Sequence, residues 1–445
     1  MSISNRKHMI LILMGITLIV VGYYFVHSVY PQISIVGGGV GAPMVVNNPN
    51  LKVETVFKGL RLPTSMVFLG PNDILVLEKD DGTVQRIVND TMLPQPLLQV
   101  PVATESERGM LGIAVAKHKN GPAYVFLYYT ESGGGKAGDD STSQIDPAGN
   151  RLYRYELVNN RLVNPKLLLS LPATPGPNHD GGKVVIGPDN NVYVVIGDLR
   201  SHRTQAQNVV DGPPVDGTGG IIRITQDGQA VADNPLGRAY PQNLYYAYGI
   251  RNSFGMDFDP LTGNLWDTEN GPNYGDEINL VEPGFNSGWA QVQGLWTPNG
   301  DIGDENAGPI DIHPSNLVDF GGKGKYRSPE FTWYQVVAPT AIKFLNSNKL
   351  GKQYENDMFV GDYLYGNLYH FKLNQNRTGL LLLEGPLASK VENTLQDLDQ
   401  VIFAKGFGAI TDIQVGPDDG YLYVLTLAGS IYRIIPASPS PPSPP

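Results

Sequence analysis

The sequence predicts an all-β protein, a six-bladed β-propeller with four-stranded antiparallel blades, preceded by one N-terminal transmembrane helix. A strand-turn-strand unit recurs along the chain. The chain is also rich in turn-forming residues, with 52 glycines and 35 prolines, and it has no long amphipathic helical pattern. An apolar stretch near the N-terminus has the length that spans a bilayer.

The recurring unit is an apolar strand, a turn built on G-P-D/N or D-P, and a strand of alternating aromatic and aliphatic residues, often followed by a third strand. Six copies begin near residues 64, 109, 181, 254, 340 and 410. Radial repetition of such units gives a propeller with loops around the mouth of a central channel. We expect the segment near residues 53–57 to complete the last blade and close the ring. The alternative, two β-sandwiches, would need a linker that no change in composition marks.

Residues 1–30 are predicted to form a membrane anchor, because residues 9–30 are apolar apart from Thr17, His27 and Ser28. Basic residues precede this stretch and no basic cluster follows it. The positive-inside rule then predicts a single-pass protein of the cell membrane with its folded domain outside the cytoplasm. The alternative is a cleaved signal peptide and a secreted protein.

The rest of the chain divides into three expected parts. Residues 31–50 contain GGGVGAP and are interpreted as a flexible spacer, residues 51–436 as the propeller, and residues 437–445 as an extended Pro/Ser-rich tail. Residues 296–329 form a long polar insert that we expect to lie as a loop over one face.

Composition excludes several classes of function. Acidic residues outnumber basic ones, 43 to 32, and no run of Lys and Arg is present, which argues against a nucleic-acid partner. Cysteine is absent, which excludes disulfides, thiolate catalysis, iron–sulfur clusters and cysteine-ligated zinc. Any metal must therefore be held by oxygen or imidazole ligands.

His179 is the first candidate for chemistry. It lies in a loop just ahead of two glycines and a predicted strand pair, within residues 177–198. Histidine has an ordinary pKa near neutrality, so a loop histidine positioned by strands can accept a proton. The alternative is a surface histidine without a function.

The second candidate is a cation site within residues 245–289. Gly271 and Pro272 form a turn that can direct backbone carbonyls outward, and Asp276 and Glu277 add carboxylates nearby. Carbonyl and carboxylate oxygens are the ligands that Ca²⁺ prefers. The alternative is a solvated acidic turn.

Five motifs carry a family resemblance: H-D-G-G-K, I-G-D, G-I-R-N, E-N-G-P-N-Y-G-D-E-I-N-L and N-S-G-W. From about residue 53 to residue 435 the chain resembles the soluble quinoprotein sugar dehydrogenases, the glucose/sorbosone and aldose dehydrogenases that use pyrroloquinoline quinone on a six-bladed propeller. The resemblance implies an oxidoreductase that acts on a carbohydrate substrate and binds the quinone and Ca²⁺.

The resemblance also implies roles for individual residues. His179 matches the general base, Asp198 the carboxylate that orients and stabilises the imidazole, and Arg251 an arginine beside the quinone oxygens. The implied cofactor-binding residues are Glu107, Arg251, Asn252 and Asn270. The implied metal-binding residues are Gly271, Pro272, Asp276 and Glu277.

The chain departs from this family where basic residues commonly grip the carboxylates of the cofactor. Leu364 or Tyr365 stands near a lysine position, and Ala409 and Thr411 stand where two arginines would be. Each lost charge-assisted hydrogen bond is worth roughly 1.5 to 3 kcal/mol, so we expect weaker binding of the quinone. Lys405 is a candidate substitute.

Three hypotheses remain at the level of sequence. The first is a membrane-anchored quinoprotein that oxidises an aldose or related alcohol to a lactone or acid and passes electrons to an acceptor outside the cytoplasm. The second is a noncatalytic extracellular binding propeller that has lost the cofactor clamp. The third is a calcium-dependent lactonase or esterase, for which Asn178, Asn270 and Asp276 are the candidate inward ligands.

Overall fold

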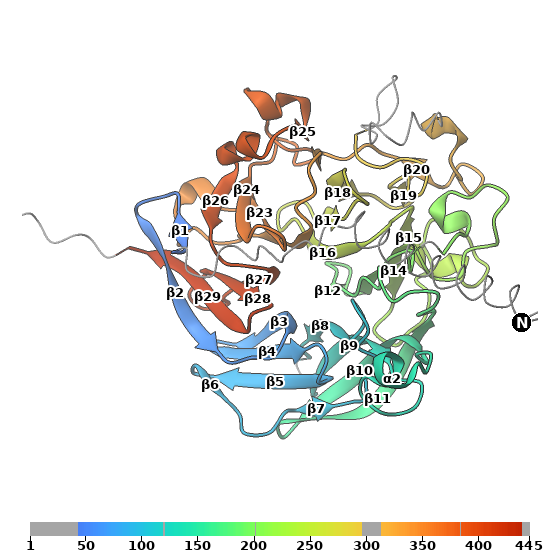
Figure 1. The fold of residues 1–445 in the computed structure, drawn as a ribbon, viewed down its shortest axis with the longest axis horizontal. Coiled ribbons are helices and arrows are strands. Elements are labelled where there is room, and N and C mark those ends of the chain that lie inside the picture. The colour runs from blue at the N-terminus through green and yellow to red at the C-terminus, as the bar shows by residue number, and fades with distance from the viewer. Residues whose placement is uncertain (1–42, 119–120, 201, 296–312, 383, 438–445) are drawn as a thin grey trace, which may run out of the picture.

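The structure, a computed structural model, describes residues 43–118, 121–200, 202–295, 313–382 and 384–437. Their strands form six sheets that stand around a common centre (Figure 1). The prediction of an all-β propeller is confirmed.

The first three sheets come from the N-terminal half of the chain. The first contains β3 (Pro63–Gly70), β4 (Asp73–Glu78), β5 (Thr83–Val88), β6 (Thr91–Met92) and β7 (Leu98–Gln99). The second contains β8 (Met110–Ala116), β9 (Ala123–Glu131), β10 (Gly149–Val158) and β11 (Arg161–Leu171). The third contains β12 (Val184–Ile186), β13 (Val192–Ile196), β14 (Gly220–Ile224), β15 (Tyr245–Tyr248), β19 (Phe285–Asn286) and β20 (Lys325–Tyr326).

The other three sheets complete the ring. The fourth contains β16 (Ser253–Phe258), β17 (Leu265–Glu269), β18 (Asp276–Val281), β21 (Phe331–Trp333) and β25 (Val391–Glu392). The fifth contains β22 (Pro339–Phe344), β23 (Met358–Asp362), β24 (Asn367–Phe371), β26 (Ile402–Lys405) and β1 (Val45–Val46). The sixth contains β27 (Ile410–Val415), β28 (Leu422–Thr426), β29 (Ser430–Pro436) and β2 (Leu51–Lys58).

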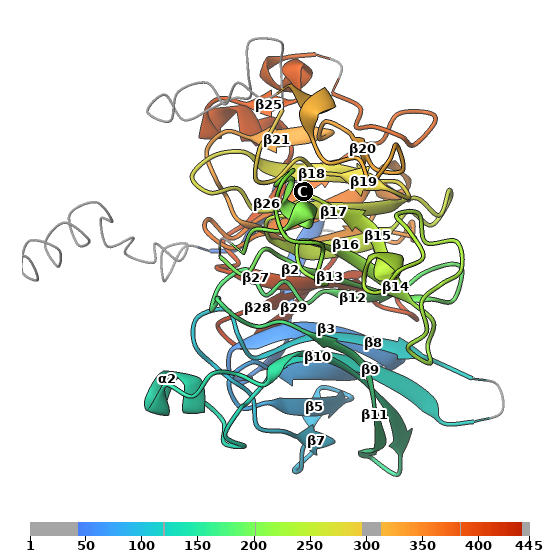
Figure 2. The same ribbon diagram turned by 90° about the vertical axis from the view of Figure 1, so that its right-hand side faces the viewer.

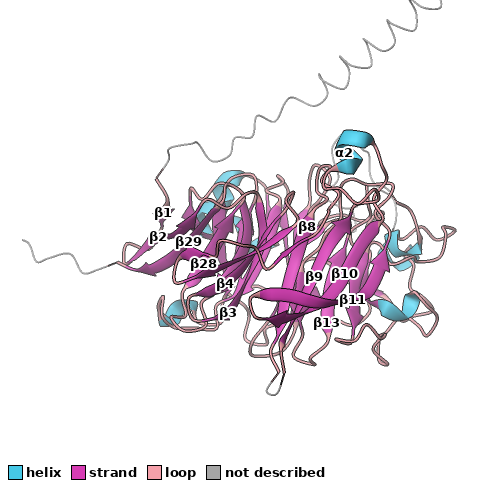
Figure 3. Cartoon of the chain, turned by 90° about the horizontal axis from the view of Figure 1, so that it is seen from below, coloured by secondary structure: helices cyan, strands magenta, loops and turns pink. Residues whose placement is uncertain are grey.

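Within the described residues the helical segments are short and lie in the loops. They are α2 (Asp139–Ser143), η1 (Gln205–Gln207), η2 (Gln242–Leu244), η3 (Pro314–Asn316), η4 (Lys352–Tyr354), η5 (Pro386–Ser389) and η6 (Leu395–Gln400). Figures 2 and 3 show the sheets stacked beside one another, with the loops gathered at the two ends of the strands.

The inner strands hold the ring together. They contact one another in the cyclic order β3, β8, β12, β16, β22 and β27, and β27 returns to β3. The loops that follow these strands and their partners therefore meet around one centre. Side chains from successive sheets can converge there even though they are far apart in the sequence.

Hydrophobic side chains fill the spaces between neighbouring sheets. Every residue of β13 and β28 is buried, because each of these central strands is covered on both faces by an adjacent sheet. Trp266 and Trp333 lie in one such layer between the fourth and fifth sheets and are fully buried. Burial on both faces explains why the central strands are apolar at nearly every position.

The second strand of the described chain, β2, closes the ring, as predicted for residues 53–57. β2 pairs antiparallel with the C-terminal β29, from Leu51 opposite Pro436 to Lys58 opposite Ser430. The two ends of the folded chain are thus joined in one sheet by backbone hydrogen bonds.

The predicted fold class is wrong in two respects. The blades are not uniformly four-stranded and antiparallel: four of the sheets have five or six strands, and β15–β19, β19–β20 and β21–β25 pair in parallel. The added strands are mostly two- or three-residue segments that cover the outer sheet edges, which are otherwise exposed to pairing with another chain.

The second error concerns the transmembrane helix. Within the described ranges no helix is long and apolar enough to cross a membrane. The predicted anchor at residues 9–30 lies outside the described residues.

Two other expected segments are partly described. β1 lies within the segment interpreted as a spacer and pairs with β26. Residues 296–312 of the polar insert lie outside the described residues, and the described remainder of the insert contains η3 and β20.

Deletion of residues 1–58 is expected to destabilise the propeller, because it removes β2 and leaves the edge of β29 unpaired. The lost ladder bonds and burial amount to roughly 5 kcal/mol or more of unfolding free energy. Denaturant unfolding of this variant, compared with deletion of residues 1–42, measures the effect. Equal stability of the two truncated proteins would contradict a structural role for the closure.

Candidate active site

A histidine–carboxylate pair forms the centre of the candidate site. His179 lies in the loop before β12, and Asp198 follows β13 of the same sheet. Nδ1 of His179 lies 2.5 Å from Oδ1 of Asp198. The other carboxylate oxygen accepts a hydrogen bond from Nε1 of Trp289 at 2.7 Å, and the backbone N–H of Arg200 donates to Oδ1 at 3.0 Å.

These contacts fix the protonation state of the pair. Burial of Asp198 opposes its ionisation, but the hydrogen bonds from His179 and Trp289 and the nearby charge of Arg251 lower its pKa below the ordinary value. An ionised carboxylate accepts hydrogen bonds only, so Nδ1 of His179 carries the proton. Nε2 of His179 then presents a lone pair and has no hydrogen-bond partner within the described ranges.

A close backbone contact positions this pair. A Cβ atom on Gly197 would lie 2.4 Å from the carbonyl oxygen of Arg251 and 2.6 Å from that of His179. The next residue, Asp198, donates its backbone N–H to the Arg251 carbonyl at 2.9 Å. Glycine in the I-G-D motif therefore allows the loops of the third and fourth sheets to meet.

Glu107 joins loops from three sheets. Its carboxylate accepts hydrogen bonds from the backbone N–H of His179 at 2.6 Å, from Nδ2 of Asn252 at 3.1 Å and from Nδ2 of Asn178 at 3.3 Å. His179 has a left-handed backbone, with φ of 66°, which is uncommon for a residue with a side chain. The bond to Glu107 helps to hold the loop in this conformation.

Arg251 lies next to this network. Its guanidinium donates to the backbone carbonyls of Asn270 and Gly271 at 2.8 and 2.9 Å and lies 5.4 Å from the ring centre of Trp289. Burial lowers the pKa of Arg251, while nearby carboxylates, first Asp198, oppose this shift. The structure thus brings together His179, Asp198, Glu107, Arg251, Asn252, Asn270 and Gly271.

The predicted carboxylate ligands of calcium are used within the protein. Asp276 accepts hydrogen bonds from the backbone N–H groups of Gly271, Val337 and Ala338, at 2.7 to 2.8 Å. In the described residues, no group of three or more His, Cys, Asp and Glu side chains is arranged to hold a metal ion.

Glu277 is occupied in the same way. It accepts from Ser287, Asn279, Gln293 and the backbone N–H of Gly294, at 2.6 to 3.2 Å. Pro272 is exposed beside this network. Calcium binding stays a prediction, and the arrangement of Asp276 gives no support to a metal-dependent hydrolase.

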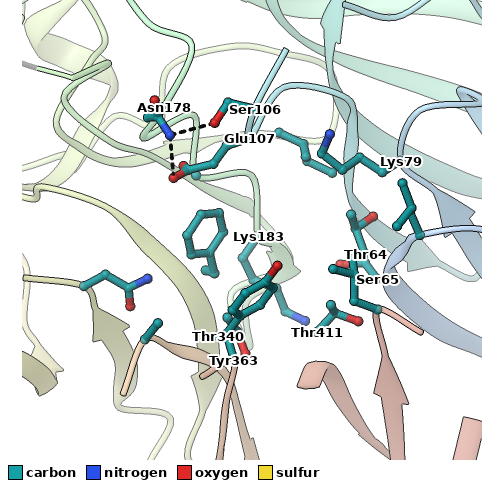
Figure 4. Close-up of a pocket in the computed structure, with 17 residues that line it drawn as sticks. Thr64, Ser65, Lys79, Ser106, Glu107, Asn178, Lys183, Thr340, Tyr363 and Thr411 are labelled. Atoms are coloured by element: carbon teal, nitrogen blue, oxygen red, sulfur yellow. Dashed lines mark hydrogen bonds between the residues drawn. The ribbon is translucent and has the colours of Figure 1, made fainter. Parts of the chain in front are cut away.

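A cavity of about 470 Å³ opens beside these residues (Figure 4). Its size lies within the usual range for small-molecule sites, about 300 to 1,000 Å³. Side chains from all six sheets or their loops contribute to its wall. The described lining residues include Thr64, Ser65, Lys79, Ser106, Glu107, Asn178, Lys183, Phe254, Asn270, Thr340, Tyr363, Thr411 and Leu427.

Two amide oxygens are buried and unpaired near this cavity, and Asn270, which carries one of them, lines it. Oδ1 of Asn252 and Oδ1 of Asn270 have no hydrogen-bond partner in the described chain. Buried polar atoms are rarely left unpaired, so such atoms at a cavity indicate a ligand or water that completes their bonding. Both residues were predicted to contact a cofactor, and their amide chemistry fits a heteroaromatic quinone.

Three residues near the site had no predicted role. Trp289 belongs to the N-S-G-W motif, but nothing in that motif indicates its bond to Asp198. Lys183 ends the H-D-G-G-K motif and lines the cavity. Lys79, which directly follows β4 of the first sheet, lines it as well. Lys405, the predicted substitute for the missing basic residues, is exposed on β26 and does not line the cavity.

The comparisons with known proteins decide the family. The family model described as glucose/sorbosone dehydrogenase matches residues 60–433. This chain belongs to the glucose/sorbosone dehydrogenase family. The predicted family is confirmed, and the chain is accordingly an oxidoreductase, which argues against the noncatalytic binding propeller.

Similar proteins agree with this assignment. This member of the dehydrogenase family is 29% identical over 440 residues to quinoprotein glucose dehydrogenase B of Acinetobacter calcoaceticus, covering 86% of this chain and 87% of that one. It is 26% identical over 405 residues to aldose sugar dehydrogenase YliI of Escherichia coli, covering 89% and 94%.

A solved structure shows the same fold. The aldose sugar dehydrogenase of Streptomyces coelicolor, in its form bound to pyrroloquinoline quinone, matches this dehydrogenase with a TM-score of 0.61 at 21% identity, covering 87% of this chain and 99% of that one.

Gly197→Ala is expected to disturb the site through the backbone. The added methyl group meets two carbonyl oxygens, so the loops must separate at a cost of about 1 to 3 kcal/mol. We expect lower thermal stability and a large loss of activity. Gly70→Ala is the matched control, because a Cβ atom on Gly70 would have no heavy atom within 4 Å.

If both glycine variants keep full activity and stability, the contact at Gly197 does not position the site.

Several carboxyl groups are buried in the propeller. Burial raises the pKa of Asp267 to about 8, and the charge of Glu277 adds to the shift. Burial likewise raises the pKa of Asp180 and of Asp362 to about 7. Each folded-state pKa lies above its unfolded value, so the folded protein holds protons that the unfolded chain releases.

Stability should therefore fall as the pH rises from about 4 to about 8. Each such group contributes a slope of up to about 1.4 kcal/mol per pH unit within its window. Asp267→Asn should make the decline shallower, measured by denaturant unfolding at pH 5 and pH 8 in metal-free buffer. The exposed Asp418→Asn serves as the control. An unchanged slope in Asp267→Asn would show that Asp267 is ionised in the folded protein.

Proposed function

We propose that this protein oxidises an aldose sugar, or a related alcohol, to the corresponding lactone with pyrroloquinoline quinone as the hydride acceptor and His179 as the general base. The observation that carries the proposal is the His179–Asp198 pair, 2.5 Å apart, beside a cavity lined by Asn270 with its unpaired amide oxygen. The names of the relatives support the substrate class and the cofactor.

His179 removes the proton from the anomeric hydroxyl. Nε2 accepts this proton because Nδ1 already donates to Asp198. As the O–H bond breaks, a C1=O bond forms and the C1 hydrogen leaves with its electron pair as hydride. The quinone supplies an acceptor for that hydride. His179 later returns its proton to solvent.

Asp198 and Glu107 support the base in different ways. Asp198 stabilises the imidazolium that forms when Nε2 is protonated, since an ionised carboxylate favours the charged ring. Glu107 fixes the loop through the backbone N–H of His179. Asn178, which binds the same carboxylate, lines the cavity and supplies amide groups for sugar hydroxyls.

Arg251, Asn252 and Asn270 are the residues proposed to contact the cofactor. The guanidinium supplies positive charge where the reduced cofactor gains negative charge. Its bonds to two carbonyls and its contact with Trp289 hold it in one position. Calcium at Gly271 and Pro272 stays a prediction, since the Gly271 carbonyl accepts a hydrogen bond from Arg251, and the proton transfer to His179 does not depend on it.

The proposal includes an electron acceptor outside the cytoplasm, to which the electrons taken from the sugar are passed. Location outside the cytoplasm is part of the proposal and rests on the sequence alone, on the apolar stretch at residues 9–30, which also fits a signal peptide.

Titration of the protein with pyrroloquinoline quinone tests the proposal. Absorbance of bound quinone reports binding, and reduction of a dye with a panel of aldoses reports turnover. We expect saturable binding and sugar-dependent reduction that disappears in His179→Ala. Absence of binding at micromolar quinone in the folded protein, with and without added Ca²⁺, would overturn the proposal.

Asp198→Asn is expected to lower kcat on the order of 10³-fold with little change in quinone affinity, because an amide no longer fixes the Nδ1–H tautomer. Steady-state kinetics and quinone titration together measure this. Asp357→Asn, which alters the His370–Asp357 pair outside the cavity, is the matched control. Equal kcat in the two variants would remove Asp198 from the mechanism.

A further inference from the structure

The cavity carries an uneven distribution of charge. Among the described residues that line it, the basic ones are Lys79 and Lys183, and the acidic one is Glu107. Figure 4 shows Lys79 on the wall with Thr64 and Ser65, and Lys183 pointing toward Thr411, while Glu107 lies with Asn178. The described lining therefore offers two cations to a ligand.

Lys183 is buried and oriented by Asp412. Its Nζ lies 2.6 Å from Oδ1 of Asp412, and the two side chains are 8% and 1% exposed. An ammonium has three N–H donors, and Asp412 is the acceptor that the described residues provide for them. Donors remain for a ligand in the cavity.

Lys79 is more weakly held. Its Nζ lies 2.7 Å from the carboxylate of Asp80, which is 43% exposed, and 3.4 Å from the carbonyl oxygen of Thr104. An exposed ion pair contributes little free energy, so Lys79 can exchange Asp80 for a buried anion. An anion in the cavity would meet this ammonium in a less hydrated setting, where the attraction is stronger.

Two hydroxyl groups that line the cavity already donate within the protein. Thr64 donates to the carbonyl of Met110 and Thr340 to that of Ile410. Thr411 stands at one of the positions where the family resemblance implies an arginine and lines the cavity with a short neutral side chain. The positive charge available to an anion beside these residues is that of Lys79 and Lys183.

We propose that Lys79 and Lys183 bind carboxylate groups of the anionic quinone cofactor and take the place of the basic residues missing at positions 364 or 365, 409 and 411. The inference rests on the proposed function and deepens it. The cofactor's negative charge then lies toward the two lysines.

Equilibrium binding of the quinone to the protein, followed by tryptophan fluorescence and by absorbance without sugar, tests the inference. Lys79→Met should weaken the affinity about tenfold or more and reduce its dependence on salt. Lys79→Arg keeps the charge and should stay within about threefold of the wild type. Lys405→Met, at the exposed position outside the cavity, should bind as the wild type does.

A second measurement needs no variant. The trimethyl ester of the quinone lacks the three negative charges, so the wild type should bind it at least tenfold more weakly than the acid, and Lys79→Met should bind the ester as the wild type does. With quinone bound, KM for glucuronate and for glucose distinguishes a carboxylate of the sugar from one of the cofactor.

The outcomes separate the two proposals. If the wild type binds quinone and oxidises aldoses but the folded Lys79→Met variant binds quinone unchanged, the lysine assignment is wrong and the proposed function stands. A change confined to KM for glucuronate, or equal affinity of the wild type for acid and ester, also overturns the assignment. No binding of quinone to the wild type overturns both.

Discussion

The site depends on one close backbone contact between neighbouring sheets. Gly197 lies against the carbonyl oxygens of His179 and Arg251, and the adjacent N–H of Asp198 bonds to Arg251. This contact sets the distance between the imidazole and its carboxylate and the place of the guanidinium beside them. The closed ring of inner strands makes the contact possible, because it fixes the third sheet against the fourth.

The carboxylates around this contact serve different purposes according to their surroundings. Asp198 is kept ionised by donors from three directions, whereas burial raises the pKa of Asp267. Asp276 and Glu277 follow the predicted cofactor residue Asn270 in the sequence. They accept hydrogen bonds from backbone and side-chain donors, and these bonds hold the loops in place. Acidic residues near a cavity are therefore not interchangeable, and their hydrogen-bond donors distinguish a catalytic partner from a structural one.

Much of the architecture could be predicted from the sequence because its signals are local. The repeated strand-turn units predicted the propeller, and β2 was expected at the closure because an isolated strand before the first unit has no other partner. The added edge strands could not be predicted, since segments of two residues such as β19 and β25 have no periodicity. The predicted transmembrane helix has no counterpart within the described ranges.

The contacts of the site also include some that the sequence could indicate and some that it could not. His179 precedes and Asp198 follows the strand pair β12–β13, and both belong to short motifs. Their contact could therefore be inferred from the sequence. Lys183 and Asp412 are 229 residues apart and meet because β12 and β27 both face the centre of the ring. Trp289 reaches Asp198 from 91 residues away. Neither contact leaves a pattern in a single sequence.

The most direct test of the account is the tautomer of His179, observed by ¹⁵N NMR of selectively labelled protein near pH 8, with His179→Gln used to assign the signals. The account predicts a proton on Nδ1, bonded to Asp198, and a lone pair on Nε2. In Asp198→Asn this preference should be lost. A proton on Nε2 in the wild-type protein would contradict the assignment of His179 as the base.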